Sequence, residues 1–191
     1  MATAKPDKAA EIAAILEPAG LTLVPRPPWV PPVEEMGLTL EENALLKGRA
    51  LVAATGSPSI ADDTGLEVVA LGGAPGVRSA RFAGEEATYE QNVTLLVSRM
   101  EGVPDRRARF RTVAAAVFPD GLEVAAEGTV EGTIGTSPRG EGGFGYDPVF
   151  IPAEGDGRSF AEMTTAEKNA CSHRARAFAA LVTLLEARLE E

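Results

Sequence analysis

Ser59-Ile60-Ala61-Asp62-Asp63-Thr64-Gly65-Leu66-Glu67-Val68 is the stretch around which we expect the fold to be organised. Two adjacent carboxylates, Asp62 and Asp63, follow a strand-like run and precede a glycine, which predicts a position at the end of a strand. A divalent cation or a raised pKa is the usual way to keep two such carboxylates in one site. The pair is therefore a candidate metal ligand or general base. The alternative is a solvated turn in which the Asp and Thr side chains hydrogen-bond their own backbone.

Helices and strands are expected on both sides of this stretch. Capping-box patterns open two of the helices, and Pro119-Asp120-Gly121 indicates the turn of a hairpin. The expected helices are residues 5–17, 39–55, 88–100 and one that begins after Thr164; the expected strands are 21–24, the Asp62-Asp63 strand, 66–71, 106–118, 122–135 and 148–151. This mixture predicts an α/β (α+β) fold with a mixed β-sheet, flanking helices and no domain linker in residues 1–191.

Composition excludes several classes of protein. The net charge of −10 argues against a nucleic-acid partner held through its phosphates. The single Cys171 leaves no intramolecular disulfide and suits a reducing compartment. No signal peptide and no apolar run of membrane-spanning length is present, so we expect a cytoplasmic protein without a membrane partner.

Three further segments carry groups that suit an anionic, planar ligand. Lys5 and Lys8 stand where a helix begins and could meet phosphate oxygens, unless this terminus is simply frayed and solvated. Phe144-Gly145-Tyr146-Asp147 could stack on a base, or its aromatic rings could belong to the core. The last helix carries Lys168, His173 and Arg174.

The geometry of that last helix leaves two possibilities. On an uninterrupted helix Lys168 and Ser172 would share a face, while His173 would point about 100° away. Either the helix breaks there or the side chains have different roles. The three donors could also be no more than an exposed polar face.

Three strings taken together resemble the inosine/xanthosine triphosphate pyrophosphatase family. They are Ser59 to Gly84, Gly142 to Pro148, and Glu167-Lys168-Asn169-Ala170-Cys171-Ser172-His173-Arg174. The resemblance covers nearly the whole chain. It implies Mg²⁺-dependent hydrolysis of ITP, dITP and XTP to the monophosphate and pyrophosphate, and a homodimer. It also implies an elongated domain of two lobes around a long twisted mixed sheet, with the nucleotide cleft between the lobes.

The same resemblance suggests roles for individual residues. Asp63 would be the catalytic carboxylate and a Mg²⁺ ligand, and Glu34 would be the second ligand. The residues that would contact the nucleotide are Thr3, Lys5, Lys8, Thr64, Phe144, Gly145, Tyr146, Asp147 and Lys168, while His173 and Arg174 would recognise the base. One departure stands out: the family's Thr-Gly-Asn-x-Gly-Lys pattern reads Thr3-Ala4-Lys5-Pro6-Asp7-Lys8 here, and the apolar first strand before it is nearly absent.

Two other functions remain open at this point. A pyrophosphatase of related fold, as in the Maf-like family, would act on pyrimidine or modified nucleotides. A nucleotide-binding module without turnover would bind ITP and release no pyrophosphate. A panel of nucleoside triphosphates separates these alternatives.

Overall fold

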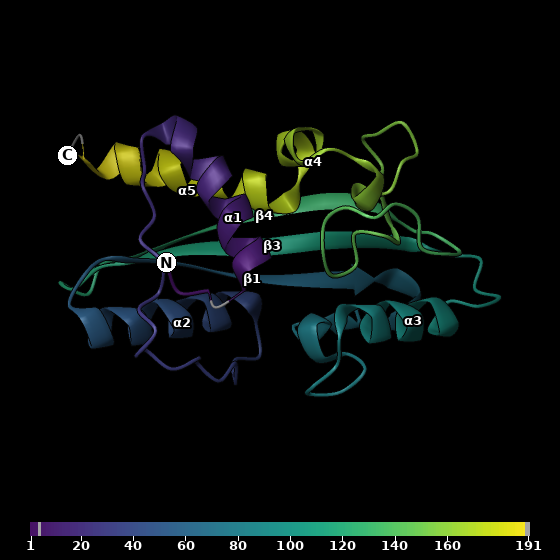
Figure 1. Cartoon of the computed structure of the whole chain (residues 1–191), viewed down its shortest axis with the longest axis horizontal. Coiled ribbons are helices and arrows are strands. Elements are labelled where there is room, and N and C mark those ends of the chain that lie inside the picture. Colours follow the sequence, from purple (N-terminus) through teal and green to yellow (C-terminus); the bar gives the residue numbers. More distant parts are fainter. Residues whose placement is uncertain (4, 190–191) are drawn as a thin grey trace. The chain divides into compact units, whose positions relative to one another are not determined.

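The computed structural model describes residues 1–3 and 5–189 (Figure 1). The chain falls into two compact units. Unit 1 comprises Met1–Asp63, Thr112–Gly128 and Arg174–Glu191; unit 2 comprises Thr64–Arg111 and Thr129–His173. Three of the four boundaries between the units fall within strands and the fourth falls within the last helix, so each of these elements contributes residues to both units. None of the described helices is long and apolar enough to cross a lipid bilayer.

One antiparallel sheet has the strand order β2-β1-β3-β4-β5. Its strands are β1 (Ser59–Val68), β2 (Pro75–Gly76), β3 (Arg107–Val117), β4 (Glu123–Ile134) and β5 (Phe150–Pro152). At one edge Leu66 of β1 pairs with Gly76, and at the other Thr133 of β4 pairs with Ile151. The predicted hairpin is confirmed as β3 and β4.

In unit 1, the core lies between the strands and two helices, α1 (Pro6–Leu16) and α5 (His173–Leu189). β3 and β4 supply alternate residues, and because most of these are alanine the helices can approach closely. The core residues are Ile12, Leu16, Ala114, Ala116, Val124, Ala126, Ala177, Phe178 and Leu181. The opposite face of these strands carries α2 (Leu40–Thr55) (Figure 1).

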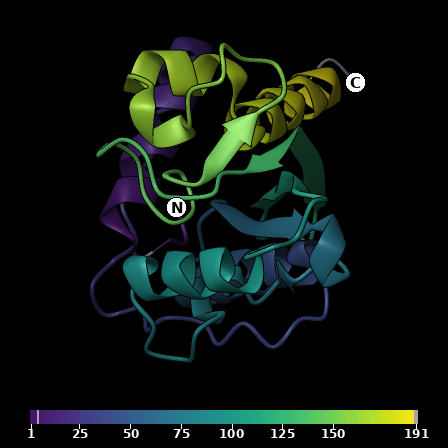
Figure 2. The same cartoon turned by 90° about the vertical axis from the view of Figure 1, so that its right-hand side faces the viewer.

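In unit 2, α3 (Tyr89–Arg99) covers one face of the strands and α4 (Thr165–Cys171) lies on the other (Figures 1 and 2). Three short 3-10 turns, Val69–Leu71, Ser79–Arg81 and Phe160–Glu162, connect these elements. Leu66, Val93, Leu96 and Phe150 lie in the core, where Phe110 packs edge-on against Phe150 with ring centroids 4.6 Å apart.

The predicted α/β class is confirmed, and the capping boxes predicted at Thr39, Thr88 and Thr164 all form. The sheet is antiparallel, whereas the sequence suggested strands of both directions. The last helix breaks at Ser172, which has an extended backbone with ψ of 153° between α4 and α5.

Three predictions about strands were wrong. Asp62 and Asp63 lie within β1 rather than at a strand end, because β1 continues through Gly65 to Val68. Residues 66–71 are therefore no separate strand, and residues 69–71 form a 3-10 turn that ends at left-handed Gly72. Residues 21–24 form no strand, and Leu21 and Val24 are exposed rather than packed against a sheet.

Candidate functional site

Asp63 is buried within β1, and both of its carboxylate oxygens are held by α2. Lys47 Nζ donates to Asp63 Oδ1 at 2.8 Å, and Asn43 Nδ2 donates to Asp63 Oδ2 at 3.3 Å. Asn43 and Lys47 are four residues apart, so one helical face presents both. Lys47 Nζ also donates to Glu35 Oε1 at 2.9 Å. One ammonium group thus bridges two carboxylates.

The pKa values in this cluster follow from burial and from the shared cation. Burial raises the pKa of Asp63 above its ordinary value, and Lys47 offsets only part of that effect. Burial alone would lower the pKa of Lys47, but Asp63 and Glu35 together raise it. Burial would likewise raise the pKa of Glu35, yet Lys47 holds it below its ordinary value. The Lys47 ammonium and the Glu35 carboxylate are therefore charged at neutral pH.

The donor set around Asp63 fits a magnesium ion. Mg²⁺ is usually held by one or two carboxylates together with substrate phosphates and water. Asp63 and Glu35 supply two carboxylates that already share one cation. Within residues 1–3 and 5–189, no three His, Cys, Asp or Glu side chains form a group that could hold a metal by themselves. The substrate's phosphates would have to complete the coordination.

Glu35, and not Glu34, is the acidic residue that the structure brings to Asp63. The backbone turns at Glu35, because the Met36 N–H donates to the Glu34 carbonyl oxygen at 3.1 Å, as in a γ-turn. Glu34 is exposed, whereas Glu35 is half-buried and its carboxylate accepts from Lys47. The sequence could not determine which of the two faces β1.

Asp62 faces a different set of partners, because neighbouring side chains on a strand point to opposite faces. Lys8 Nζ lies 3.0 Å from Asp62 Oδ1, and Arg174 Nε donates to Asp62 Oδ2 at 3.3 Å. Arg174 Nη1 also donates to Glu11 Oε2 at 2.8 Å. Glu11, Asp62 and Arg174 are buried and Lys8 is half-buried, and together they form an ion-pair network that joins β1, α1 and α5. The two aspartates therefore avoid mutual repulsion by facing separate cations.

This network changes the pKa values of its members. Burial would raise the pKa of Asp62, but the charges of Lys8 and Arg174 outweigh it and lower that pKa to about 2. Burial lowers the pKa of Lys8 to about 8, and Asp62 opposes that shift only partly. Asp62 is thus fully ionised at neutral pH.

A second group of predicted residues lies in unit 2. Lys168 Nζ of α4 donates to Asp147 Oδ2 at 2.7 Å, and the same oxygen accepts from the Phe144 backbone N–H at 2.8 Å. Lys168 Nζ also lies 4.7 Å from the centroid of the Phe144 ring. Gly145, with a φ of 64°, makes the turn between these residues. The structure therefore brings Phe144, Asp147 and Lys168 together.

Tyr146 packs in the core of unit 2. It is 4% exposed, its hydroxyl donates to Ser79 O at 2.9 Å, and burial raises its pKa. Of the two aromatic residues in this loop, only Phe144 is partly exposed.

His173 and Arg174 are adjacent in sequence but belong to separate clusters. The His173 ring stacks on Phe110, with centroids 4.5 Å apart and an interplanar angle of 23°. Arg174 belongs to the network around Asp62. Each residue is only 2% exposed, so neither forms part of an exposed polar face.

The remaining predicted residues lie near the start of α1 and within β1. Thr3 Oγ1 accepts from the Lys5 backbone N–H at 3.2 Å, and Lys5 is the exposed N-cap residue of α1. Ala4 lies outside the described residues. Thr64 is half-buried and directly follows Asp63 in β1.

Several residues of these clusters did not stand out in the sequence. Glu11, Asn43 and Lys47 were not among the predicted site residues. Asn43 and Lys47 share a helical face because of their spacing of four, and this pattern could have drawn attention to them. Glu11 carries no comparable signal, because it is one acidic residue on an amphipathic helix.

Comparison with known proteins identifies a family. The model of the Ham1 family matches residues 1–184. A protein from Streptomyces coelicolor named dITP/XTP pyrophosphatase is 48% identical, covering 97% of this chain and 95% of its own length. A Thermus thermophilus protein of the same name is 49% identical over 95% of this chain and 88% of its own.

Solved structures agree with this relationship. A HAM1 protein from Coxiella burnetii superposes with a TM-score of 0.87 and 38% identity, covering 97% of this chain and 96% of its own. A nucleoside-triphosphatase / dITP/XTP pyrophosphatase from Mycobacterium abscessus gives a TM-score of 0.74 and 42% identity, covering 96% of this chain and 97% of its own. From the extent and identity of these matches, the chain belongs to the Ham1 family.

Proposed function

We propose that this protein hydrolyses non-standard purine nucleoside triphosphates, namely ITP, dITP and XTP, to the monophosphate and pyrophosphate, with Mg²⁺ as cofactor. The observation that carries the proposal is the buried Asp63, whose two oxygens are fixed by Lys47 and Asn43 beside Glu35. The names of the related enzymes support the same reaction.

Asp63 is proposed to orient and deprotonate the water that attacks the α-phosphorus. A pKa raised by burial suits a carboxylate to accept a proton, and the bonds from Asn43 and Lys47 fix its direction. Asp63 and Glu35 would hold Mg²⁺, with Glu35 in the place that the sequence suggested for Glu34. When bound, the ion would offset the negative charge of the phosphates.

Positive side chains are proposed to bind the triphosphate. Lys8 at the start of α1 and Lys168 at α4 would offset charge that develops on the phosphates as pyrophosphate leaves. Thr3, Lys5 and Thr64 are proposed to lie beside the substrate. Phe144, with Gly145 and Asp147, is proposed to contact the nucleoside, whereas the burial of Tyr146 favours a structural role for that residue.

Base selection is proposed to depend on hydrogen-bond donors. Hypoxanthine and xanthine carry an acceptor oxygen at the six-position, where adenine carries a donor amino group. A site that offers only donors, from His173, Arg174 or backbone N–H groups, leaves adenine badly paired. Each buried unpaired group costs about 1–3 kcal/mol, or roughly one to two decades in rate.

The experiment that tests this proposal is a substrate panel. Pyrophosphate release is measured from ITP, dITP, XTP, GTP, ATP and dTTP, with and without Mg²⁺. We expect pyrophosphate release from ITP, dITP and XTP to be faster than from the other three nucleotides, and to require Mg²⁺. Preference for dTTP or modified nucleotides would favour a Maf-like activity, and binding of ITP without release would favour a non-catalytic module.

Three further expectations stay predictions. The resemblance suggests a homodimer and a two-lobed domain with the nucleotide cleft between its lobes. The single cysteine suggests a cytoplasmic location. The oligomeric state can be measured by sedimentation equilibrium.

A further inference from the structure

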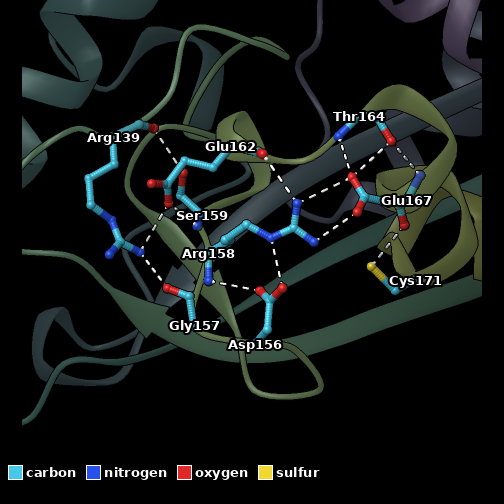
Figure 3. Close-up of polar contacts among 9 residues, drawn as sticks. All are labelled: Arg139, Asp156, Gly157, Arg158, Ser159, Glu162, Thr164, Glu167 and Cys171. Atoms are coloured by element: carbon cyan, nitrogen blue, oxygen red, sulfur yellow. Dashed lines mark hydrogen bonds and ion pairs between the residues drawn. The ribbon is translucent and has the colours of Figure 1, made fainter.

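Two arginines, Arg139 and Arg158, fix residues 156–162, which lie between β5 and α4, to the neighbouring segments (Figure 3). On one side, the Arg158 guanidinium forms a two-pronged contact with Glu167, in the first turn of α4. Arg158 Nη2 donates to Glu167 Oε1 at 2.8 Å, and Nη1 donates to Glu167 Oε2 at 3.3 Å. Asp156 orients the same guanidinium by accepting from Nε at 2.8 Å. Arg158 thus ties the segment to the start of α4.

On the other side, Arg139 ties the same segment to the start of the glycine-rich loop of residues 140–147. Arg139 Nη2 donates to Gly157 O at 2.6 Å and lies 3.2 Å from Glu162 Oε2. Ser159 Oγ donates back to Arg139 O at 2.8 Å (Figure 3). The loop itself adds a bond from Gly142 N to Ala161 O at 3.0 Å. The segment is therefore fixed to both of its neighbours.

The two segments that Arg139 and Arg158 join are those that carry the candidate nucleotide contacts of unit 2. Lys168 follows Glu167 directly, and Asp147 ends the glycine-rich loop. Glu167 Oε2 also accepts from the backbone N–H of Thr164, the N-cap residue of α4, at 2.7 Å and so completes the capping box. The hydrogen bonds from Arg158, followed by those from Thr164, lower the pKa of Glu167 to about 2. The Glu167 carboxylate is therefore ionised at neutral pH.

We propose that Arg158 is a positioning residue, which fixes the first turn of α4 so that Lys168 keeps its place against Asp147 and Phe144. The inference rests on the proposed function, because it takes Lys168 to bind the nucleotide. Arg158 itself touches neither Lys168 nor Phe144 through any of the contacts given above. It acts through Glu167 and the helix.

Arg158 is partly exposed, but its contact with Glu167 differs from an isolated ion pair on the surface. Isolated exposed ion pairs contribute little, but a planar guanidinium that makes two parallel bonds fixes orientation as well as distance. Arg107 provides an internal comparison. Arg107 pairs with Asp105 as Arg158 pairs with Asp156. In both pairs the arginine backbone N–H donates to Oδ1 of the aspartate two residues earlier, at 3.2 Å. Arg107 lies at the start of β3, outside the segments described here.

The experiment compares Arg158→Gln with Arg107→Gln in the full chain, by kcat/KM for dITP in saturating Mg²⁺. We expect Arg158→Gln to lower kcat/KM about tenfold, because small misplacements of a substrate-binding group cost up to about a hundredfold. Arg107→Gln should stay within about twofold of the wild type. Equal effects of the two substitutions would overturn the proposal.

A double-mutant cycle shows whether Arg158 acts through Lys168. If it does, adding Arg158→Gln to Lys168→Met should change kcat/KM by less than about twofold, because the group to be positioned is gone. A further tenfold loss in the double variant would overturn the proposal. Adding Arg107→Gln to Lys168→Met should likewise have no effect beyond twofold, and melting temperatures identify any variant that fails to fold.

A third variant tests the partner of Arg158. Glu167→Gln keeps an oxygen that can cap α4 but loses the charge that binds Arg158. We expect a loss similar to that of Arg158→Gln, and full activity would overturn the proposal. If the wild type itself released no pyrophosphate from any nucleotide, the proposed function would fail first, together with the role of Lys168 on which this inference rests.

Discussion

Asp62→Asn is the substitution whose effect on stability can be worked out most completely from the structure. Asp62 is buried between Lys8 and Arg174, at 3.0 and 3.3 Å. Removing its charge leaves the buried Arg174 and the half-buried Lys8 with one carboxylate, Glu11, within this network. Breaking a buried pair by removing one partner typically costs about 3–5 kcal/mol. We expect a loss of that size in the free energy of unfolding at pH 7.

The pH dependence of that loss follows from the shifted pKa of Asp62. Its pKa is about 2 in the folded protein and 3.8 when unperturbed. A lowered carboxylate pKa stabilises the folded state above the unfolded pKa, and this contribution disappears as the pH falls toward the folded pKa. The difference corresponds to roughly 2 kcal/mol. The penalty of Asp62→Asn should therefore shrink by about that amount between pH 5 and pH 2.

Urea denaturation followed by circular dichroism at several pH values measures this effect. Asp105→Asn is the matched control, because Asp105 also pairs with an arginine and also has a pKa of about 2, but its side chain is 39% exposed to solvent, against 1% for that of Asp62. Screening by water and salt should leave the control close to the wild type. A penalty for Asp62→Asn that stays constant from pH 6 to pH 2.5 would refute the reasoning.

Two other substitutions test base selection and loop packing. Arg174→Ala should lower kcat/KM for ITP more than for ATP, if Arg174 recognises the base; an equal loss for both would leave it only its role in the ion-pair network. Gly140→Ala should lower stability by about 3 kcal/mol, because Gly140 has a φ of 80° and an added Cβ would collide with the Ala161 backbone. Gly72→Ala, at a φ of 64° with open space around it, should cost only about 1 kcal/mol, and similar melting temperatures for the two glycine variants would contradict this account.

Local signals predicted the helices and the hairpin well. The capping boxes at Thr39, Thr88 and Thr164 form because each needs only residues within one turn of the chain. The turn at Asp120-Gly121 likewise depends on local backbone geometry. These features were accessible because nothing distant in sequence decides them.

The surroundings of the acidic pair could not be predicted in the same way. The local sequence around Asp62 and Asp63 resembles that of a turn. β1 nevertheless runs through both residues, because cations from three helices neutralise their carboxylates. Arg174 is 112 residues from Asp62, and no local pattern indicates that contact. The choice between Glu34 and Glu35 depended on which of the two side chains turns toward Lys47.

The most direct test of the proposed function is pyrophosphate release by Asp63→Asn. With dITP and excess Mg²⁺, kcat should fall by about a thousandfold, because general-base catalysis contributes about 10²–10⁴ in rate. Circular dichroism should match that of the wild type, and Asp120→Asn in the exposed turn should retain full activity. Turnover by Asp63→Asn close to the wild-type rate would remove Asp63 from the mechanism and contradict the account.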